Sequence, residues 1–259
     1  MIRSWLQTWM LAAPALVLLQ AGLYGQGGRG AAPPPANAKA AAPADLTGQW
    51  VSVVTEDWRY RMMVPGKGDY AGVPLTPAGR KLADGWDPMK DEAEGNTCKA
   101  FGPPGVMRAP GRVRISWADD DTLKLETDAG TQTRMFYFKD PKATSGDLQG
   151  ISVASWEALA AARAAGNPGT GGPRRTGALK VVTTNMKPGY LRLNGVPYSD
   201  KAVLTEYFDR TNEANGDSWL VDTAIVEDPM YLNLPFVTSA HFRKETNLSN
   251  WHPTPCSVK

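Results

Sequence analysis

Short runs in which every second side chain is apolar recur along this chain, and they limit the folds open to it. Residues 112–117 alternate in this way, and short turns join them to residues 122–127 and 131–138. A two-residue period is typical of half-buried β-strands. Turns this short join antiparallel neighbours, so the pattern predicts a β-meander in the middle of the chain.

The same pattern extends over most of the remaining sequence. Further strands are predicted in residues 50–63, 179–185, 202–210, 219–227 and 236–244, with an Asn-Gly hairpin turn within residues 212–217. Helical structure is predicted in residues 76–84 and 87–94 and in the alanine-rich residues 155–165. Strands and helices do not alternate as in βαβ units. We therefore predict a mainly β fold, an antiparallel barrel or a sandwich, with one or two short helices.

The start of the chain differs in composition from the rest. Residues 1–25 combine a positive charge at Arg3, an apolar stretch interrupted by Pro14 and a small-residue exit, which is the layout of a secretory signal peptide. The apolar stretch is shorter than the roughly 20 residues of a spanning helix, and an uncleaved anchor is the alternative. Residues 26–44 predict a flexible Gly/Ala/Pro linker, and residues 45–259 a single domain. We expect a periplasmic or secreted protein without stable membrane insertion after signal cleavage.

Charges of both signs are interspersed, and the formal net charge is +2. This balance argues against a nucleic-acid partner, because nucleic-acid surfaces carry a concentrated basic patch. Arg108, Arg112 and Arg114 do form a local basic cluster. We interpret it as a solvated strand and turn, with an anion site as the alternative.

The chain has two cysteines, Cys98 and Cys256, which are expected to pair in an oxidising compartment. A reactive thiol at Cys98, beside Lys99, is the alternative. The two histidines, His241 and His252, are too few and too isolated for a histidine-built metal centre. Since no zinc, dinucleotide or phosphate-loop signature occurs either, no metal or cofactor is predicted.

Two short motifs resemble those of lipocalins and related calycin barrels: Gly48-Gln49-Trp50 at the start of the domain, and Thr205-Glu206-Tyr207 leading to Arg210. This resemblance implies a lipocalin-like barrel in which Trp50 plugs the closed end. The chain also resembles an uncharacterised family of exported bacterial β-rich proteins, through Cys98, Cys256 and residues 74–77, 87–88, 103–108, 150–157, 179–184, 204–210, 226–229 and 234–236. The family implies export, a mostly β fold and paired terminal cysteines, but no activity. This chain departs from it in the Ala-rich and Gly-rich residues 158–177.

Several charged side chains fall on strand faces that also carry aromatic residues. They predict a polar-lined pocket for a small ligand, with the candidate residues Trp50, Glu56, Trp58, Arg134, Phe136 and Glu206. Glu56 and Glu206 are also candidate general acids or bases, with His241 as a partner. The structural alternative is that Glu56–Arg134 or Glu206–Arg210 are ion pairs that fix the strand register. A register slip of one residue would instead place all of these side chains in solvent.

The leading functional hypothesis is an exported lipocalin-like protein that binds a small, largely apolar molecule in its barrel. One alternative is a periplasmic enzyme, an isomerase, cyclase or hydrolase that uses the buried carboxylates. The other is an envelope scaffold or partner-binding protein that uses the Gly/Pro-rich residues 166–177 as an exposed, mobile loop.

Overall fold

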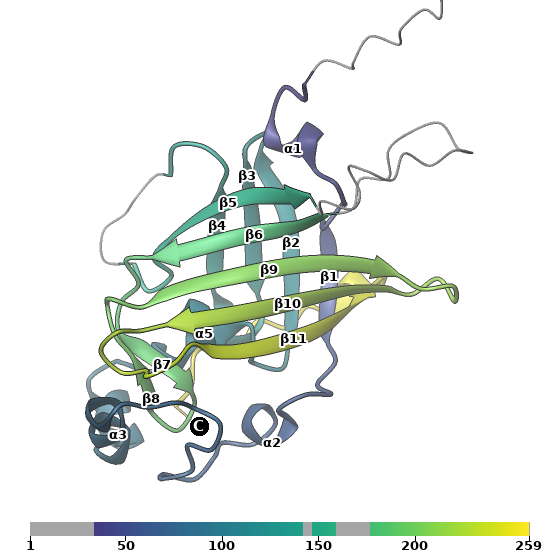
Figure 1. The fold of residues 1–259 in the computed structure, drawn as a ribbon. Helices are drawn as coiled ribbons and strands as arrows, with labels where there is room; N and C mark the ends of the chain where they lie inside the picture. Colours follow the sequence, from purple (N-terminus) through teal and green to yellow (C-terminus); the bar gives the residue numbers. More distant parts are fainter. Residues whose placement is uncertain (1–33, 142–146, 159–176, 259) are drawn as a thin grey trace, which may run out of the picture. The chain divides into compact units, whose positions relative to one another are not determined.

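The computed structural model describes residues 34–141, 147–158 and 177–258, and the elements named below lie in the compact unit Pro35–Lys259. Nine of the described strands close into a barrel in the order β1, β11, β10, β9, β6, β5, β4, β3 and β2 (Figure 1). Their bounds are β1 (Gly48–Ser52), β2 (Arg112–Asp119), β3 (Thr122–Thr127), β4 (Thr133–Tyr137), β5 (Ile151–Ala158), β6 (Gly177–Thr184), β9 (Val203–Asn212), β10 (Ser218–Glu227) and β11 (Phe236–Glu245). Two shorter strands, β7 (Gly189–Arg192) and β8 (Val196–Tyr198), pair with each other. The predicted mainly β barrel is therefore confirmed.

The orientation of the barrel strands is mixed. The meander β2–β3–β4 is antiparallel as predicted, and so is the hairpin that joins β9 to β10. β4 and β5, however, run in parallel, with Phe136 beside Ser152 and Tyr137 beside Val153. The uniformly antiparallel arrangement expected from the sequence thus fails at this pair of neighbours.

The described helices are short. They are α1 (Ala38–Ala41), α2 (Trp58–Arg61), α3 (Pro77–Asp84), α4 (Pro88–Ala93) and α5 (Pro103–Val106), with the 3₁₀ turns η1 (Lys99–Phe101), η2 (Ala129–Thr131) and η3 (Leu248–Asn250). Thr76 caps α3 by accepting a hydrogen bond from the Gly79 N–H at 3.0 Å, and Asp87 caps α4 in the same way. The helical prediction for residues 76–94 is thereby confirmed. None of the described helices is both long and apolar enough to cross a membrane.

The strand predicted over residues 50–63 is wrong beyond its start. β1 ends at Ser52, and Asp57 adopts a left-handed backbone conformation, with a φ of 52°, at the start of α2. A left-handed residue interrupts an extended strand, because this conformation lies outside the β region. The apparent alternation of this segment therefore continues in a loop and a helical turn rather than in a strand.

The helix predicted over residues 155–165 is also wrong where it is described. Residues up to Ala158 belong to β5, in which Trp156 is the register partner of Leu179 on β6. Pairing with a neighbouring strand here outweighs the helical propensity of alanine. The remainder of that prediction, and nearly all of the predicted loop 166–177, lie outside the described residues.

Residues 35–44, within the segment predicted to be a linker, include α1. Asn37 caps this turn by accepting from the Ala40 N–H at 2.8 Å. The backbone of Ala38 accepts from the Trp156 indole N–H and donates to Asp121, both at 2.8 Å. These contacts hold α1 against strands β3 and β5 and their turns.

Inward-facing side chains from all nine barrel strands fill its core. Trp50 is fully buried there and donates from its indole N–H to the Leu46 carbonyl at 3.0 Å. Phe101, Val106 and Met107, from η1, α5 and the residue after α5, belong to the same cluster and close one end of the barrel. We refer to this end, where β1 and β6 finish and β2 and β5 begin, as the capped end. Figure 1 shows α2, α3, β7 and β8 gathered there.

Candidate functional site

A cavity of about 390 Å³ lies at the capped end, between α2, η1, α5, β7 and the C-terminal tail. Much of its lining is apolar and includes Phe101, Ala109, Pro110, Leu191 and Pro255. Small-molecule sites in proteins begin at about 300 Å³. The cavity is therefore large enough for a small ligand.

Three arginines supply the charge of this cavity: Arg61, Arg108 and Arg192. Arg61 on α2 is buried and donates from Nε to the carbonyl oxygen of Arg108 at 2.9 Å. Arg108, two residues after α5, donates from Nη2 to Asp57 at 3.0 Å. Arg192, the last residue of β7, donates from Nη1 to the Ala71 carbonyl at 2.8 Å. Backbone and side-chain contacts thus fix all three guanidinium groups in place.

The guanidinium groups retain unused hydrogen-bonding capacity. Arg108 Nη1 and Arg192 Nε are buried and have no hydrogen-bond partner among the described residues. The described lining of the cavity contains no aspartate or glutamate. Burial lowers the pKa of Arg192, and repulsion from Arg108 lowers it further. An anion in the cavity would relieve this repulsion.

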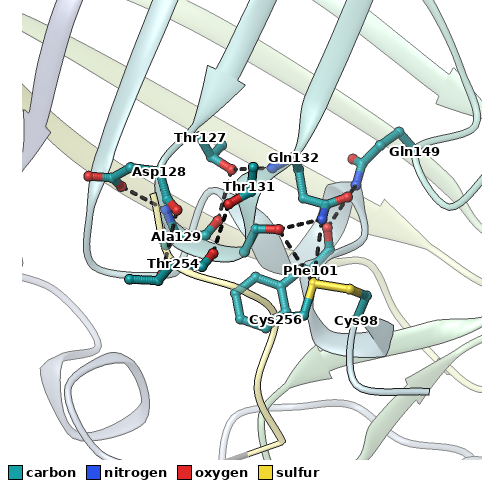
Figure 2. Close-up of a disulfide and its surroundings, with 11 residues drawn as sticks. Cys98, Phe101, Thr127, Asp128, Ala129, Thr131, Gln132, Gln149, Thr254 and Cys256 are labelled. Atoms are coloured by element: carbon teal, nitrogen blue, oxygen red, sulfur yellow. Dashed lines mark hydrogen bonds between the residues drawn. A yellow bond between two sulfur atoms is a disulfide. The ribbon is translucent and has the colours of Figure 1, made fainter. Parts of the chain in front are cut away.

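The Cys98–Cys256 disulfide joins two walls of the cavity (Figure 2). It links positions 158 residues apart, with their Cα atoms 5.0 Å apart. Cys98 directly precedes η1, which carries Phe101, and Cys256 lies between the lining residues Pro255 and Ser257. The predicted disulfide is confirmed, and the alternative of a free Cys98 thiol is wrong.

Hydrogen bonds anchor the C-terminal tail beside this disulfide. The Thr254 N–H donates to the Asp128 carbonyl at 2.8 Å, and the Thr131 hydroxyl donates to the Thr254 carbonyl at 2.9 Å. Figure 2 shows these contacts between the tail and the β3–β4 connection. The tail is therefore a fixed wall of the cavity.

A buried ion pair crosses the interior of the barrel. Arg134 on β4 donates from Nη1 and Nη2 to the two carboxylate oxygens of Glu206 on β9, at 2.7 and 2.5 Å. Neither side chain is exposed to solvent. Thr183 Oγ1 also accepts from Arg134 Nη2 at 3.2 Å and shares a hydrogen bond with Ser152 at 2.8 Å. The ion pair links β4 to β9, which are not neighbours in the barrel, and the two hydroxyl groups come from β5 and β6, which lie between them. The network is therefore a structural element of the core.

Asp222 on β10 is a second buried carboxyl group close to this pair. Neither of its oxygens has a hydrogen-bond partner among the described residues. Burial raises the pKa of Asp222 well above its usual range, and the negative charge of Glu206 raises it further. The barrel interior therefore favours the neutral, protonated form of Asp222.

This environment predicts how Asp222→Asn changes stability with pH. The native pKa of Asp222 lies above its unfolded value, so the stability it contributes is complete below the unfolded pKa, about 3.9, and is lost as the pH rises through the native pKa. Asparagine does not titrate, so the variant does not lose stability in this way. The free energy of unfolding of the variant should therefore increase relative to that of the wild type as the pH rises. Urea unfolding from about pH 4 to about pH 9 measures this difference.

Asp217→Asn serves as the control, since Asp217 is a partly exposed residue of the β9–β10 turn, outside the barrel core, and the stability difference of this variant from the wild type should not grow with pH. A constant difference between Asp222→Asn and the wild type over the whole pH range would contradict the protonated state.

The structure separates the six predicted ligand-binding residues. Four of them lie in the barrel core: Trp50, Arg134, Phe136 and Glu206. Of these, Arg134 lies beside Phe136, with its guanidinium carbon 4.9 Å from the ring centroid, as well as against Glu206. None of the six lines the described part of the capped-end cavity. A ligand-binding role for them stays a prediction.

The interpretation that Glu56 and Trp58 face the interior is wrong, because β1 ends before them. Trp58 on α2 is 60% exposed. Glu56 pairs with Arg61, not with Arg134, and its Oε2 lies 3.3 Å from Nδ1 of His241.

The structure does not bring Glu206 together with His241. Alternation along β11 buries Ala240 and Phe242, which leaves His241 on the outer face, whereas Glu206 points inward. The expected Glu206–Arg210 ion pair is also wrong. Arg210 donates instead to Asn212 and to Ser218, near the opposite end of β9.

Sequence reasoning missed Arg61 and Arg192, because neither lies in a basic cluster or on a predicted core face. Arg108 did carry a signal, since it belongs to the local cluster for which an anion site was the alternative. Its neighbour Arg112 pairs with Glu245 at 2.9 Å, whereas Arg108 is buried and lines the cavity. The interpretation of this cluster as a solvated strand and turn is therefore wrong for Arg108.

Within the described parts of the chain, no group of three or more His, Cys, Asp or Glu residues is arranged to hold a metal ion. Comparison with known proteins finds no matching family model, no matching curated protein and no matching solved structure.

Proposed function

We propose that this chain is an exported binding protein whose capped-end cavity holds a small, mostly apolar molecule with one anionic group. The observation that carries the proposal is the pair of buried, unpartnered N–H groups on Arg108 and Arg192. Both residues line a cavity whose described lining has three arginines, many apolar groups and no acidic side chain.

The chemistry of the lining favours an amphipathic ligand. Guanidinium groups bind carboxylates and phosphates through charge-assisted hydrogen bonds. The apolar side chains around them, such as Phe101 and Leu191, favour burial of a hydrocarbon body. A ligand with both parts uses every class of group that the cavity offers.

The proposed site lies at the capped end, whereas the sequence predicted a binding site inside the barrel. Around Arg134 the interior holds a fully buried ion pair together with Phe136 and Phe208, whose ring centroids lie 5.6 Å apart. A ligand there would have to displace a paired charge, which is costly. The cavity at the capped end requires no such displacement, so it is the better supported site for a lipocalin-like function.

Two features support export. The disulfide is of a kind that persists in oxidising compartments. The signal-like residues 1–25 lie outside the described part of the chain, and the periplasmic or secreted location rests on their composition.

Arg192→Met tests the site. A hydrogen bond to a charged group contributes about 1.5–3 kcal/mol, so we expect the variant to bind decanoate at least about tenfold more weakly than the wild type does. Decanol, which lacks the anionic group, should bind the wild type weakly and should not distinguish the two proteins. Isothermal titration calorimetry with both probes measures the difference.

The matched control is Arg243→Met, which removes an exposed arginine on β11 and should leave decanoate binding unchanged. Equal affinity of the wild type for decanoate and decanol would contradict the proposed anion recognition. Equal decanoate affinity of Arg192→Met and the wild type would exclude this cavity as the site.

A further inference from the structure

A chain of hydrogen bonds runs from Ser239 through His241 and Thr55 to Glu56, beside the outer face of the barrel. Ser239 Oγ lies 3.1 Å from His241 Nε2, and Nδ1 of the same ring lies 3.3 Å from Glu56 Oε2. A nucleophile within hydrogen-bonding reach of a base, with a third group orienting that base, is the arrangement that activates serine in hydrolases. We propose that Ser239 is an activated nucleophile that accepts acyl groups from carboxylic esters.

The surroundings of the histidine favour the tautomer that this chemistry needs. On one side of the ring, the Thr55 hydroxyl lies 3.2 Å from Nδ1 and donates to Glu56 at 2.8 Å. Glu56 is also paired with Arg61, which holds its carboxylate in place. Because the Thr55 hydroxyl donates its proton to Glu56, it can only accept from His241, which places a proton on Nδ1 and leaves Nε2 free to accept the Ser239 proton.

Two segments distant in sequence build this cluster. Ser239 and His241 are two residues apart on β11, so both side chains point to the same outer face. The Val53 N–H donates to the His241 carbonyl at 2.8 Å and thereby aligns the segment leading to Glu56 along that strand. The His241 side chain is 35% exposed, and Ser239 is half-buried, so the cluster is open to a reagent.

The register of β10 supplies the remaining contacts for an ester. Thr223 is the direct partner of Ser239, and Val221 is the direct partner of His241. Direct cross-strand partners have Cβ atoms about 4.5–5.5 Å apart on one face. This places a second hydroxyl beside the attacked carbonyl and an apolar surface, with the exposed Val237, beside a small acyl chain.

The proposed reaction is ester hydrolysis in two steps. Ser239 Oγ bonds to the carbonyl carbon as its proton passes to His241 Nε2, and the alkoxide leaves with that proton as an alcohol. Water then loses a proton to His241 and attacks the acyl-serine, which releases the carboxylic acid and returns the proton to Ser239. In this scheme Ser239 and His241 are the catalytic residues, and Glu56 and Thr55 are positioning residues.

A biotin-tagged alkyl fluorophosphonate tests the nucleophile directly, because it phosphonylates activated serines with loss of fluoride. Intact-mass and peptide analysis of the wild type should show one adduct, on Ser239. Ser239→Ala should lose it, and His241→Gln should react at least about a hundredfold more slowly. Glu56→Gln should lower the maximal labelling rate but leave unchanged the probe concentration at which the rate is half-maximal. A merely structural role of Glu56 would not produce this selective change in the maximal rate.

Ser155→Ala is the matched control, since Ser155 is an exposed strand serine on β5, and it should label like the wild type. Melting temperatures near that of the wild type show that the variants are folded. No adduct on the wild type would overturn the proposal without the need for any variant. Labelling of His241→Gln at the wild-type rate would overturn it as well. Neither result depends on the cavity proposed above.

Discussion

Glu206→Gln is expected to lower the free energy of unfolding by about 3–5 kcal/mol, because it removes the carboxylate that contacts both terminal nitrogens of the buried Arg134 guanidinium. Both carboxylate oxygens of Glu206 accept from Arg134, and neither side chain is exposed. Desolvation of an unpaired charge is the dominant cost in such a site. Urea unfolding followed by tryptophan fluorescence measures the loss.

The double variant Arg134→Met/Glu206→Met distinguishes the cost of an unpaired charge from the net contribution of the pair. Replacing both partners by apolar groups removes the uncompensated charge, so the double variant should be more stable than Glu206→Gln. The control is Glu157→Gln, which breaks the partly exposed Lys180–Glu157 pair and should cost no more than about 1 kcal/mol. If the double variant were instead destabilised by the sum of the two single losses, the side chains would not be coupled, which would contradict the unpaired charge as the cause.

The second large effect is expected from loss of the disulfide. A cross-link over 158 residues restricts the unfolded chain by up to about 5 kcal/mol in the loop-entropy model, with native strain and residual structure reducing this value. Cys98→Ala/Cys256→Ala should therefore have a much lower melting temperature. It should also bind decanoate more weakly, because the bond joins η1 to the tail and both line the cavity.

Reduction of the wild type offers an independent comparison. Complete reduction, verified by alkylation and mass, should bring its melting temperature to that of the double-alanine variant, and that variant should not respond to reductant. An unchanged melting temperature of fully reduced wild type would show that hydrogen bonds such as Thr254 to Asp128 suffice to hold the tail.

The strands that sequence analysis predicted well are those in which a strict two-residue period ends at a turn residue. Residues 122–127 are one case, and residues 219–227 with the preceding Asn-Gly turn are another. In both, local backbone chemistry and the buried face favour the same structure. Residues 50–63 failed because the alternation there continues through charged positions whose partners lie far away, such as the Arg108 carbonyl that Arg61 contacts.

The same distinction applies to the buried charges. Alternation placed Arg134 and Glu206 inside the barrel correctly, but it did not reveal that they pair with each other. They are 72 residues apart, on strands separated in the barrel by β5 and β6. Such a partnership depends on closure of the sheet, which no local pattern encodes. The cavity was beyond prediction for the same reason, since its arginines come from a helix, a loop and a short strand that meet only in the fold.

The most direct test of anion binding at the capped end is native mass spectrometry of protein purified from its own host, with small-molecule analysis of what it releases. We predict one bound molecule per chain that carries a carboxylate or another acidic group on an apolar body, and its loss from Arg192→Met. A bound molecule without an acidic group, or one retained equally by Arg192→Met, would contradict the assignment.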